Sequence, residues 1–133
     1  MSDKTVAEKL RIKPGTTVWC SPAEHLKRIG PLPEGVGSAD GPATAATAIV
    51  FVDDEASLRR TLADHGADLT QTDIVWIAYP KGGASDINRD KLPPILGELP
   101  MRPIGQIAVD ETWSALRFRP LKPGEGPFEG GRR

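Results

Sequence analysis

Cysteine is almost missing from this 133-residue chain, in which Cys20 is the only thiol. A single cysteine cannot form an intrachain disulfide or a multi-cysteine zinc cluster. Long apolar runs are also missing, since none approaches the ~20 residues that a membrane-spanning helix needs. The stretch from Met1 to Arg11 carries charges throughout and lacks the apolar centre of a signal peptide. We therefore expect a soluble, cytoplasmic protein with no membrane partner.

A strong charge of one sign is absent as well. The chain has 17 Lys and Arg against 18 Asp and Glu, which gives a formal net charge of −1. A near-neutral total argues against a protein that is organised around nucleic-acid phosphates. The basic pairs are interpreted as solvated helix faces and a charged tail: Lys27-Arg28, Arg59-Arg60 and Arg132-Arg133. We expect no nucleic-acid partner.

What the chain does contain is a regular alternation of apolar runs and helical patterns. Strands are predicted at 16–20, 46–52 and 74–79, with a possible short strand around Val36, and helices at 4–11, 23–30, 54–66 and 92–99. Two alternating runs at 104–109 and 113–119 predict a hairpin. This order predicts an α/β fold: a mostly parallel sheet of about five strands, helices on both faces and a C-terminal antiparallel hairpin.

The length fits a single domain, which we place at residues 1–120. Glycine and proline are concentrated in residues 30–42 and 120–131, and such clusters mark loops. Residues 121–133 have too little apolar mass to pack and are predicted to form a flexible tail.

The apolar run from Ile74 to Tyr79 ends abruptly in proline, lysine and two glycines. Ligands of open α/β sheets bind beyond the carboxyl ends of such strands. The candidate ligand-binding residues are therefore Tyr79, Lys81, Gly82, Gly83, Asp86 and Arg89. Lys81 with its two glycines can form a small anion site, although a glycine turn with a solvent-facing lysine is the simpler interpretation. Asp86 can equally cap a helix, with Arg89 as its ion-pair partner.

A second cluster lies in the predicted hairpin turn and consists of Asp110, Glu111 and Trp113. Two carboxylates beside an indole can hold a cation, position a water or contact a partner. Neighbouring residues of a strand point to opposite faces, so the two acids need not converge. Trp113 has core packing as its alternative role.

The turn after the first predicted strand lacks the glycines that let a backbone approach a dinucleotide or S-adenosylmethionine. It reads Cys20-Ser21-Pro22-Ala23-Glu24, in which proline removes an N–H donor. Asp40 falls about where a ribose-binding acid would stand, but Asp40-Gly41 is also an ordinary turn. We therefore predict no cofactor. The two histidines, His25 and His65, have no neighbours at metal-ligand spacing, so no metal is predicted, and Cys20 is interpreted as a small buried thiol.

Three stretches carry a family resemblance. Lys13-Pro14-Gly15-Thr16-Thr17-Val18 resembles the entry to the first strand of Rossmann-type methyltransferases, and the closing strand pair resembles the end of that fold. A closer likeness is to a bacterial domain-of-unknown-function family of small proteins. It rests on residues 10–15, on Tyr79-Pro80-Lys81-Gly82 and on residues 110–118. The resemblance implies a trimmed methyltransferase-like sheet, and no activity attaches to the family.

Two functional hypotheses follow from these observations. The first is a non-catalytic binding or regulatory module, whose edge hairpin, or the crevice from Lys81 to Arg89, contacts a protein partner or a second copy of the chain. The alternative is a small-molecule or nucleotide-binding protein, a weak transferase that uses Tyr79, Lys81, Gly82 and Gly83.

Overall fold

The computed structural model describes residues 6–21, 23–30, 32–81, 86–87, 90–98 and 101–120. Its helices and strands follow one another along the chain in this order: α1 (Val6–Lys9), β1 (Thr17–Ser21), the 3₁₀ helix η1 (Ala23–Ile29), β2 (Gly37–Ser38), the 3₁₀ turn η2 (Pro42–Thr44), β3 (Thr47–Phe51), α2 (Glu55–Leu69), β4 (Ile74–Pro80), α3 (Leu92–Leu96), β5 (Met101–Ala108) and β6 (Trp113–Pro120). The predicted tail at 121–133 lies outside the described residues.

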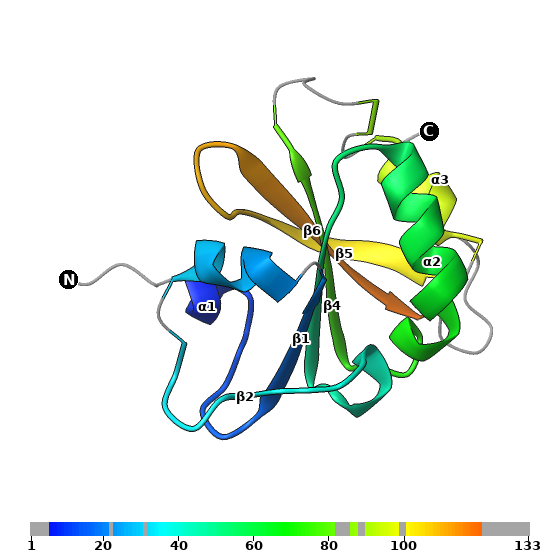
Figure 1. Ribbon diagram of the computed structural model, residues 1–133. Helices are drawn as coiled ribbons and strands as arrows, with labels where there is room; N and C mark the ends of the chain where they lie inside the picture. Colours follow the sequence, from blue (N-terminus) through cyan, green and yellow to red (C-terminus); the bar gives the residue numbers. More distant parts are fainter. Residues whose placement is uncertain are drawn as a thin grey trace.

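The strands form one six-stranded sheet in the order β2-β1-β3-β4-β6-β5 (Figure 1). The first four are parallel to one another, while β6 runs antiparallel to both β4 and β5. The α/β class and the C-terminal hairpin are confirmed; the sheet has six strands and is mixed, with its parallel part confined to one side. The chain passes from β1 to β2 on one side and returns to β3 on the other, so the strand order reverses at β1.

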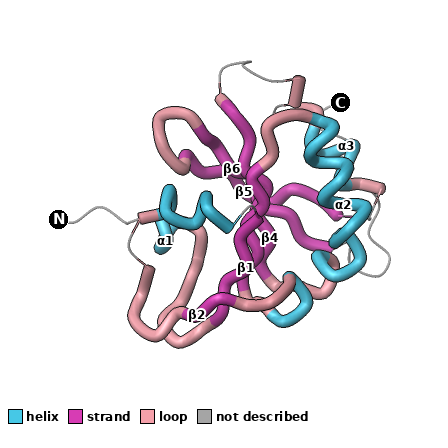
Figure 2. The backbone as a smooth tube through the Cα atoms, viewed as in Figure 1, coloured by secondary structure: helices cyan, strands magenta, loops and turns pink. Residues whose placement is uncertain are grey.

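Helices cover both faces of the sheet, as Figures 1 and 2 show. One face, called the α2/α3 face here, buries Leu58 and Leu69 of α2 and Leu92 of α3 against β3, β4 and β6. The other, the α1/η1 face, buries Leu10 and Ile29 against the reverse side of the same strands. Two apolar cores therefore enclose the central strands, and β3 is buried along its whole length.

The helix α2 begins with a capping box. The Asp54 carboxylate accepts from the Ser57 backbone N–H at 2.8 Å, and the Ser57 hydroxyl oxygen accepts from the Asp54 N–H at 3.2 Å. The helix continues to Leu69, so the predicted end at His65-Gly66 is wrong. Leu69 is fully buried, and packing of this last turn outweighs the weak helix propensity of Gly66.

Two other local expectations are confirmed and one is corrected. The helix expected at 23–30 is the 3₁₀ helix η1, and the strand expected near Val36 is the two-residue β2. The strand β5 starts at Met101, three residues earlier than predicted, and its Pro103 is tolerated because β5 is the edge strand. In the part of the chain that is described, no helix is long and apolar enough to cross a membrane.

Candidate functional site

The parallel strands all end at one edge of the sheet, and a pocket of about 310 Å³ opens there beside β1. This is the edge, next to the strand where the order reverses, at which ligands of open α/β sheets bind. We call it the Asp40 pocket. Its walls come from β1, η1 and the segment that leaves β2: Val18, Trp19, Cys20, Ala23, Leu26, Ser38, Ala39 and Asp40.

Backbone pairing with β1 fixes the position of Asp40. The Gly37 N–H donates to the Thr16 carbonyl at 3.1 Å, and the Ala39 N–H donates to the Val18 carbonyl at 2.9 Å. Asp40 follows immediately at the mouth of the pocket and is exposed. Within the described segments its carboxylate makes no hydrogen bond or ion pair. A hollow that combines apolar side chains with a few polar groups is typical of small-molecule sites.

Cys20 is one of the residues that line this pocket. Burial raises the pKa of its thiol to about 12, so the sulfur stays protonated at neutral pH. A protonated thiol is a poor nucleophile. Cys20 therefore contributes packing surface to the pocket, and it is half-buried rather than fully buried as expected.

An aromatic cluster covers the carboxyl ends of β3 and β4 next to the pocket. The His25 ring stacks on Phe51 with centroids 4.8 Å apart, and Trp113 meets His25 edge-on at 5.5 Å. The Arg28 Nε donates to His25 Nδ1 at 2.6 Å. The Arg28 guanidinium lies 5.8 Å from the centre of the Trp113 ring. η1 is thereby held over this part of the edge. Trp113 is only 5% exposed, so its indole is a core group.

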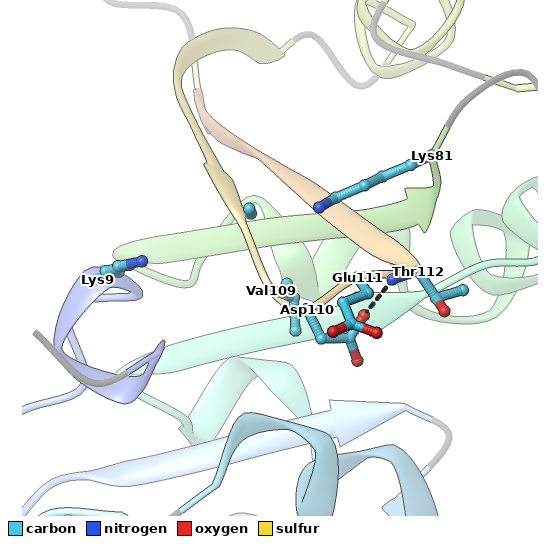
Figure 3. A pocket seen from close by; sticks show the side chains of 7 residues that line it. Lys9, Lys81, Val109, Asp110, Glu111 and Thr112 are labelled. Atoms are coloured by element: carbon cyan, nitrogen blue, oxygen red, sulfur yellow. Dashed lines mark hydrogen bonds between the residues drawn. The ribbon is translucent and has the colours of Figure 1, made fainter.

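A second, larger pocket of about 560 Å³ lies between α1 and the hairpin turn. Figure 3 shows the side chains of Lys9 and Lys81 extending from opposite sides, with Asp110 and Glu111 on the turn between them. The Lys81 N–H donates to the Thr112 carbonyl at 2.8 Å and ties the end of β4 to the hairpin. The structure therefore brings together Lys81, Asp110 and Glu111, which the sequence placed in separate clusters.

Asp110 in this pocket stabilises the turn. Its Oδ1 accepts from the backbone N–H groups of Thr112 and Trp113, both at 2.8 Å, and its Oδ2 lies 3.9 Å from the Arg28 guanidinium. A carboxylate that is held in this way is a turn-forming group. Glu111 is exposed, so it is the acid with freedom to meet a ligand.

The other predicted site residues are dispersed. Tyr79 is 4% exposed on the α2/α3 face, where its hydroxyl accepts from Gln106 Nε2 at 3.1 Å. Asp86 accepts from the Glu55 backbone N–H at 2.8 Å and so caps the first turn of α2. Gly82, Gly83 and Arg89 lie outside the described residues. Neither pocket thus unites the whole predicted set, and no group of three metal-ligating side chains occurs among the residues that are placed.

One sequence signal pointed to the Asp40 pocket, namely the spacing of Asp40 from the first strand. The missing glycines outweighed that signal in the prediction. Sequence alone does not show that η1 and the segment after β2 leave a hollow between them. The predicted absence of a cofactor rested on that judgement, and the pocket now reopens the question.

No family model and no curated protein matches the chain, so the resemblance to the domain-of-unknown-function family is not confirmed. Solved structures do match. The tRNA (m1A22) methyltransferase of Bacillus subtilis aligns with a TM-score of 0.53 at 9% identity, over 95% of this chain and 71% of that one. A Streptococcus pneumoniae protein assigned the same activity, in complex with S-adenosyl-L-methionine, aligns at 0.51 and 11% identity, over 92% and 75%. A Streptococcus agalactiae protein of the NADB-Rossmann superfamily aligns at 0.54 and 10% identity, over 97% and 71%. At these identities the likeness shows a Rossmann-like fold.

These matches correct two predictions. The interpretation as a non-catalytic interaction module rested on the missing glycines, the lack of a catalytic constellation and an edge strand that needs covering. It is contradicted by solved tRNA methyltransferases that have the same fold over most of this chain. The exclusion of nucleic acid is overturned by the same proteins, since the Bacillus subtilis structure is that of a tRNA methyltransferase. A near-neutral net charge was too coarse a criterion, because local groups decide what a surface binds.

Proposed function

We propose that the chain binds S-adenosylmethionine in the Asp40 pocket and transfers its methyl group to a nucleic-acid acceptor. The observation that carries this proposal is the position of Asp40, on the segment that leaves β2 and at the mouth of a pocket formed with β1. In nucleotide-binding α/β folds, an acid at this place accepts hydrogen bonds from the ribose hydroxyls. The ligand class and the acceptor follow the solved proteins that share the fold.

The pocket suits an adenosine group in size and lining. Its volume of about 310 Å³ is at the lower end of the range for small-molecule sites, about 300–1,000 Å³. The apolar side chains of Val18, Leu26 and Ala39 offer surface for a purine, while Asp40 offers a charged acceptor for the sugar. Because charge-assisted hydrogen bonds are the stronger ones, Asp40 is the residue expected to contribute most to affinity.

The acidic character of this edge, rather than the missing glycines, favours this ligand over a dinucleotide. In dinucleotide-binding folds the glycine-rich turn lets the backbone approach a pyrophosphate. S-adenosylmethionine has no phosphate; it carries a positively charged sulfonium group from which a nucleophile can take the methyl group. The exposed acids at this edge, Glu24 and Asp40, suit a cation and oppose a pyrophosphate. Ser21 ends β1, and Pro22 lies outside the described residues.

Isothermal titration of the chain with S-adenosylmethionine, NAD and ATP tests the binding step. S-adenosylmethionine should bind, and NAD and ATP should bind at least about tenfold more weakly. Asp40→Ala should weaken S-adenosylmethionine binding about tenfold or more, since a hydrogen bond to a charged group contributes about 1.5–3 kcal/mol. Asp64→Ala, an exposed acid on α2, is the matched control and should change nothing. Equal affinity of Asp40→Ala and the unmodified chain would refute the assignment of the pocket.

A separate assay addresses the acceptor. Incubation with methyl-labelled S-adenosylmethionine and total tRNA should transfer label to the RNA, and Asp40→Ala should reduce that transfer in proportion to its lost affinity. If S-adenosylmethionine binds and no label reaches RNA, the binding part of the proposal stands and the nucleic-acid acceptor is wrong.

A further inference from the structure

Two arginines meet on the α1/η1 face, away from the residues that form the Asp40 pocket. Arg11 lies two residues after the end of α1, and Arg117 lies in the middle of β6, opposite Trp76 of β4 and Gly105 of β5. We call them the Arg11–Arg117 pair. Both carry features that a purely structural arginine at the same position would not be expected to have.

Arg11 has an unusual backbone conformation. The Ile12 N–H donates to the Ala7 carbonyl and the Arg11 N–H to the Glu8 carbonyl, both at 3.0 Å, which is the hydrogen-bond pattern of a Schellman helix end. That motif places one residue in the left-handed region, and Arg11 has φ of 67°. Glycine normally occupies this position because a side chain there is strained.

The same chain uses glycine wherever else it adopts this conformation among the described residues. The other positive φ values, 77°, 85° and 77°, belong to Gly15, Gly30 and Gly35. Arg11 is thus a local exception to the chain's own pattern. A strained backbone that persists at one position is a reason to look for a function there.

Arg117 has an unsatisfied donor. Its Nε is buried and has no hydrogen-bond partner. Burial, and next the positive charge of Arg11, lower the pKa of the Arg117 guanidinium. In the part of the chain that the structure describes, neither guanidinium forms a salt bridge with a carboxylate. Two neighbouring cations that repel each other are unfavourable, and an anion bound at the exposed parts of the two side chains relieves that repulsion.

The surroundings hold the pair in place and leave it accessible. The buried Trp76 indole N–H donates to the Leu10 carbonyl at 2.9 Å and fixes the turn that carries Arg11. Gly105, the residue opposite Arg117 on the edge strand, is exposed and has no side chain to cover that flank. Arg11 is exposed and Arg117 partly so, and a small ion can therefore reach both.

We propose that Arg11 and Arg117 together bind a phosphate group, either free or in a nucleic-acid backbone. The planar fork of arginine matches phosphate oxygens with paired hydrogen bonds, and a phosphate would neutralise two neighbouring cations. This site stands independently of the proposed function. If the methyl acceptor is RNA, the Arg11–Arg117 pair would contact its backbone, since contacts of this kind position a polynucleotide.

Thermal unfolding in the presence of inorganic phosphate, at constant ionic strength, provides the test. The unmodified chain should gain Tm as phosphate is added. Arg11→Gly should have a higher Tm than the unmodified chain without phosphate, because glycine accepts the left-handed conformation, and should lose most of the phosphate response. Arg117→Leu should lose the response too, with phosphate affinity reduced about tenfold or more. Arg60→Ala, which removes an exposed arginine from α2, is the matched control and should respond like the unmodified chain.

Two further measurements locate the site and identify the source of the phosphate. Gly105→Val covers the flank of Arg117 without changing any charge and should weaken the phosphate response. A short single-stranded RNA, titrated in a parallel series, should raise the Tm of the unmodified chain and of Arg60→Ala. It should leave the Tm of Arg11→Gly and Arg117→Leu nearly unchanged. A response to both ligands supports a site for the phosphate group itself, and a response to RNA alone supports a backbone site. The proposal is overturned if neither ligand raises the Tm of the unmodified chain, or if Arg11→Gly and Arg117→Leu respond as it does.

Discussion

The two faces of the sheet are built differently. The α2/α3 face carries a fifteen-residue helix with a capping box, and the buried Tyr79 hydroxyl has its hydrogen-bond partner. The α1/η1 face carries a four-residue α1 and the 3₁₀ helix η1. It also holds the left-handed Arg11 and the unpartnered Nε of Arg117.

This difference indicates a division of roles. Proteins tend to break local rules where they bind or react, while regular and fully satisfied packing elsewhere supplies the stability. On this basis the α2/α3 face is the stabilising half of the molecule. The α1/η1 face, with both the Asp40 pocket and the Arg11–Arg117 pair beside its helices, is the half that we propose to bind ligands.

The strongest test of this division is to open a cavity on the stabilising face. Leu58→Ala removes a fully buried side chain of α2 and should lower the free energy of unfolding by about 2–5 kcal/mol in urea denaturation. The response to phosphate should persist below the new melting temperature, since no group of the Arg11–Arg117 pair has changed. Arg60→Ala on the exposed side of the same helix should stay within about 0.5 kcal/mol. Loss of the phosphate response in a folded Leu58→Ala protein would contradict the division.

A smaller effect is expected from the matched change on the other face. Trp76→Phe removes the indole N–H that bonds the Leu10 carbonyl and should lower stability by about 1–3 kcal/mol, because a buried acceptor is left unsatisfied. It should also weaken the phosphate response, since the turn that carries Arg11 loses its anchor. Trp19→Phe, whose ring packs against His65 of α2, is the control for the same exchange. The measurement is thermal unfolding with and without phosphate, in which Trp76→Phe should respond less than Trp19→Phe. Equal phosphate responses of the two variants would count against an anchoring role for Trp76.

Much of the architecture was predictable because it depends on local patterns. Continuous apolar runs identified β3 and β4, and alternating runs separated by a polar turn identified the β5–β6 hairpin. The acids Asp53 and Asp54 marked the start of α2. The end of α2 was missed because the burial of Leu69, a tertiary effect, carries the helix past Gly66.

The sites were less predictable because they join residues that are distant in sequence. Asp40 becomes part of a pocket only through the pairing of Ala39 with Val18, and Arg11 meets Arg117 only after β6 inserts beside β4. Lys81 and Asp110 were both singled out from the sequence, but their convergence depends on the bond between Lys81 and Thr112. Motif spacing reports neighbours along the chain, and none of these pairs is local.

The smallest effect predicted for the α1/η1 face comes from Cys20, which packs against its core. Burial raises the pKa of the thiol from 9.0 to about 12, so above pH 9 the unfolded chain loses this proton while the folded chain keeps it. The contribution of the thiol to the free energy of unfolding is therefore fully present below pH 9 and is lost as the pH rises. Between pH 8 and pH 10 the free energy of unfolding should fall by about 1.4 kcal/mol for this reason. Other groups titrate in the same range, so the relevant quantity is the difference between the unmodified chain and Cys20→Ala, measured by urea denaturation at both pH values. Between the two pH values the unmodified chain should lose about 1.4 kcal/mol more stability than Cys20→Ala. In a separate measurement, S-adenosylmethionine should slow alkylation of Cys20, because the thiol lines the Asp40 pocket. Parallel stability curves for the two proteins would mean that the thiol is exposed to water, and the pocket would then be more open at this residue than the structure places it.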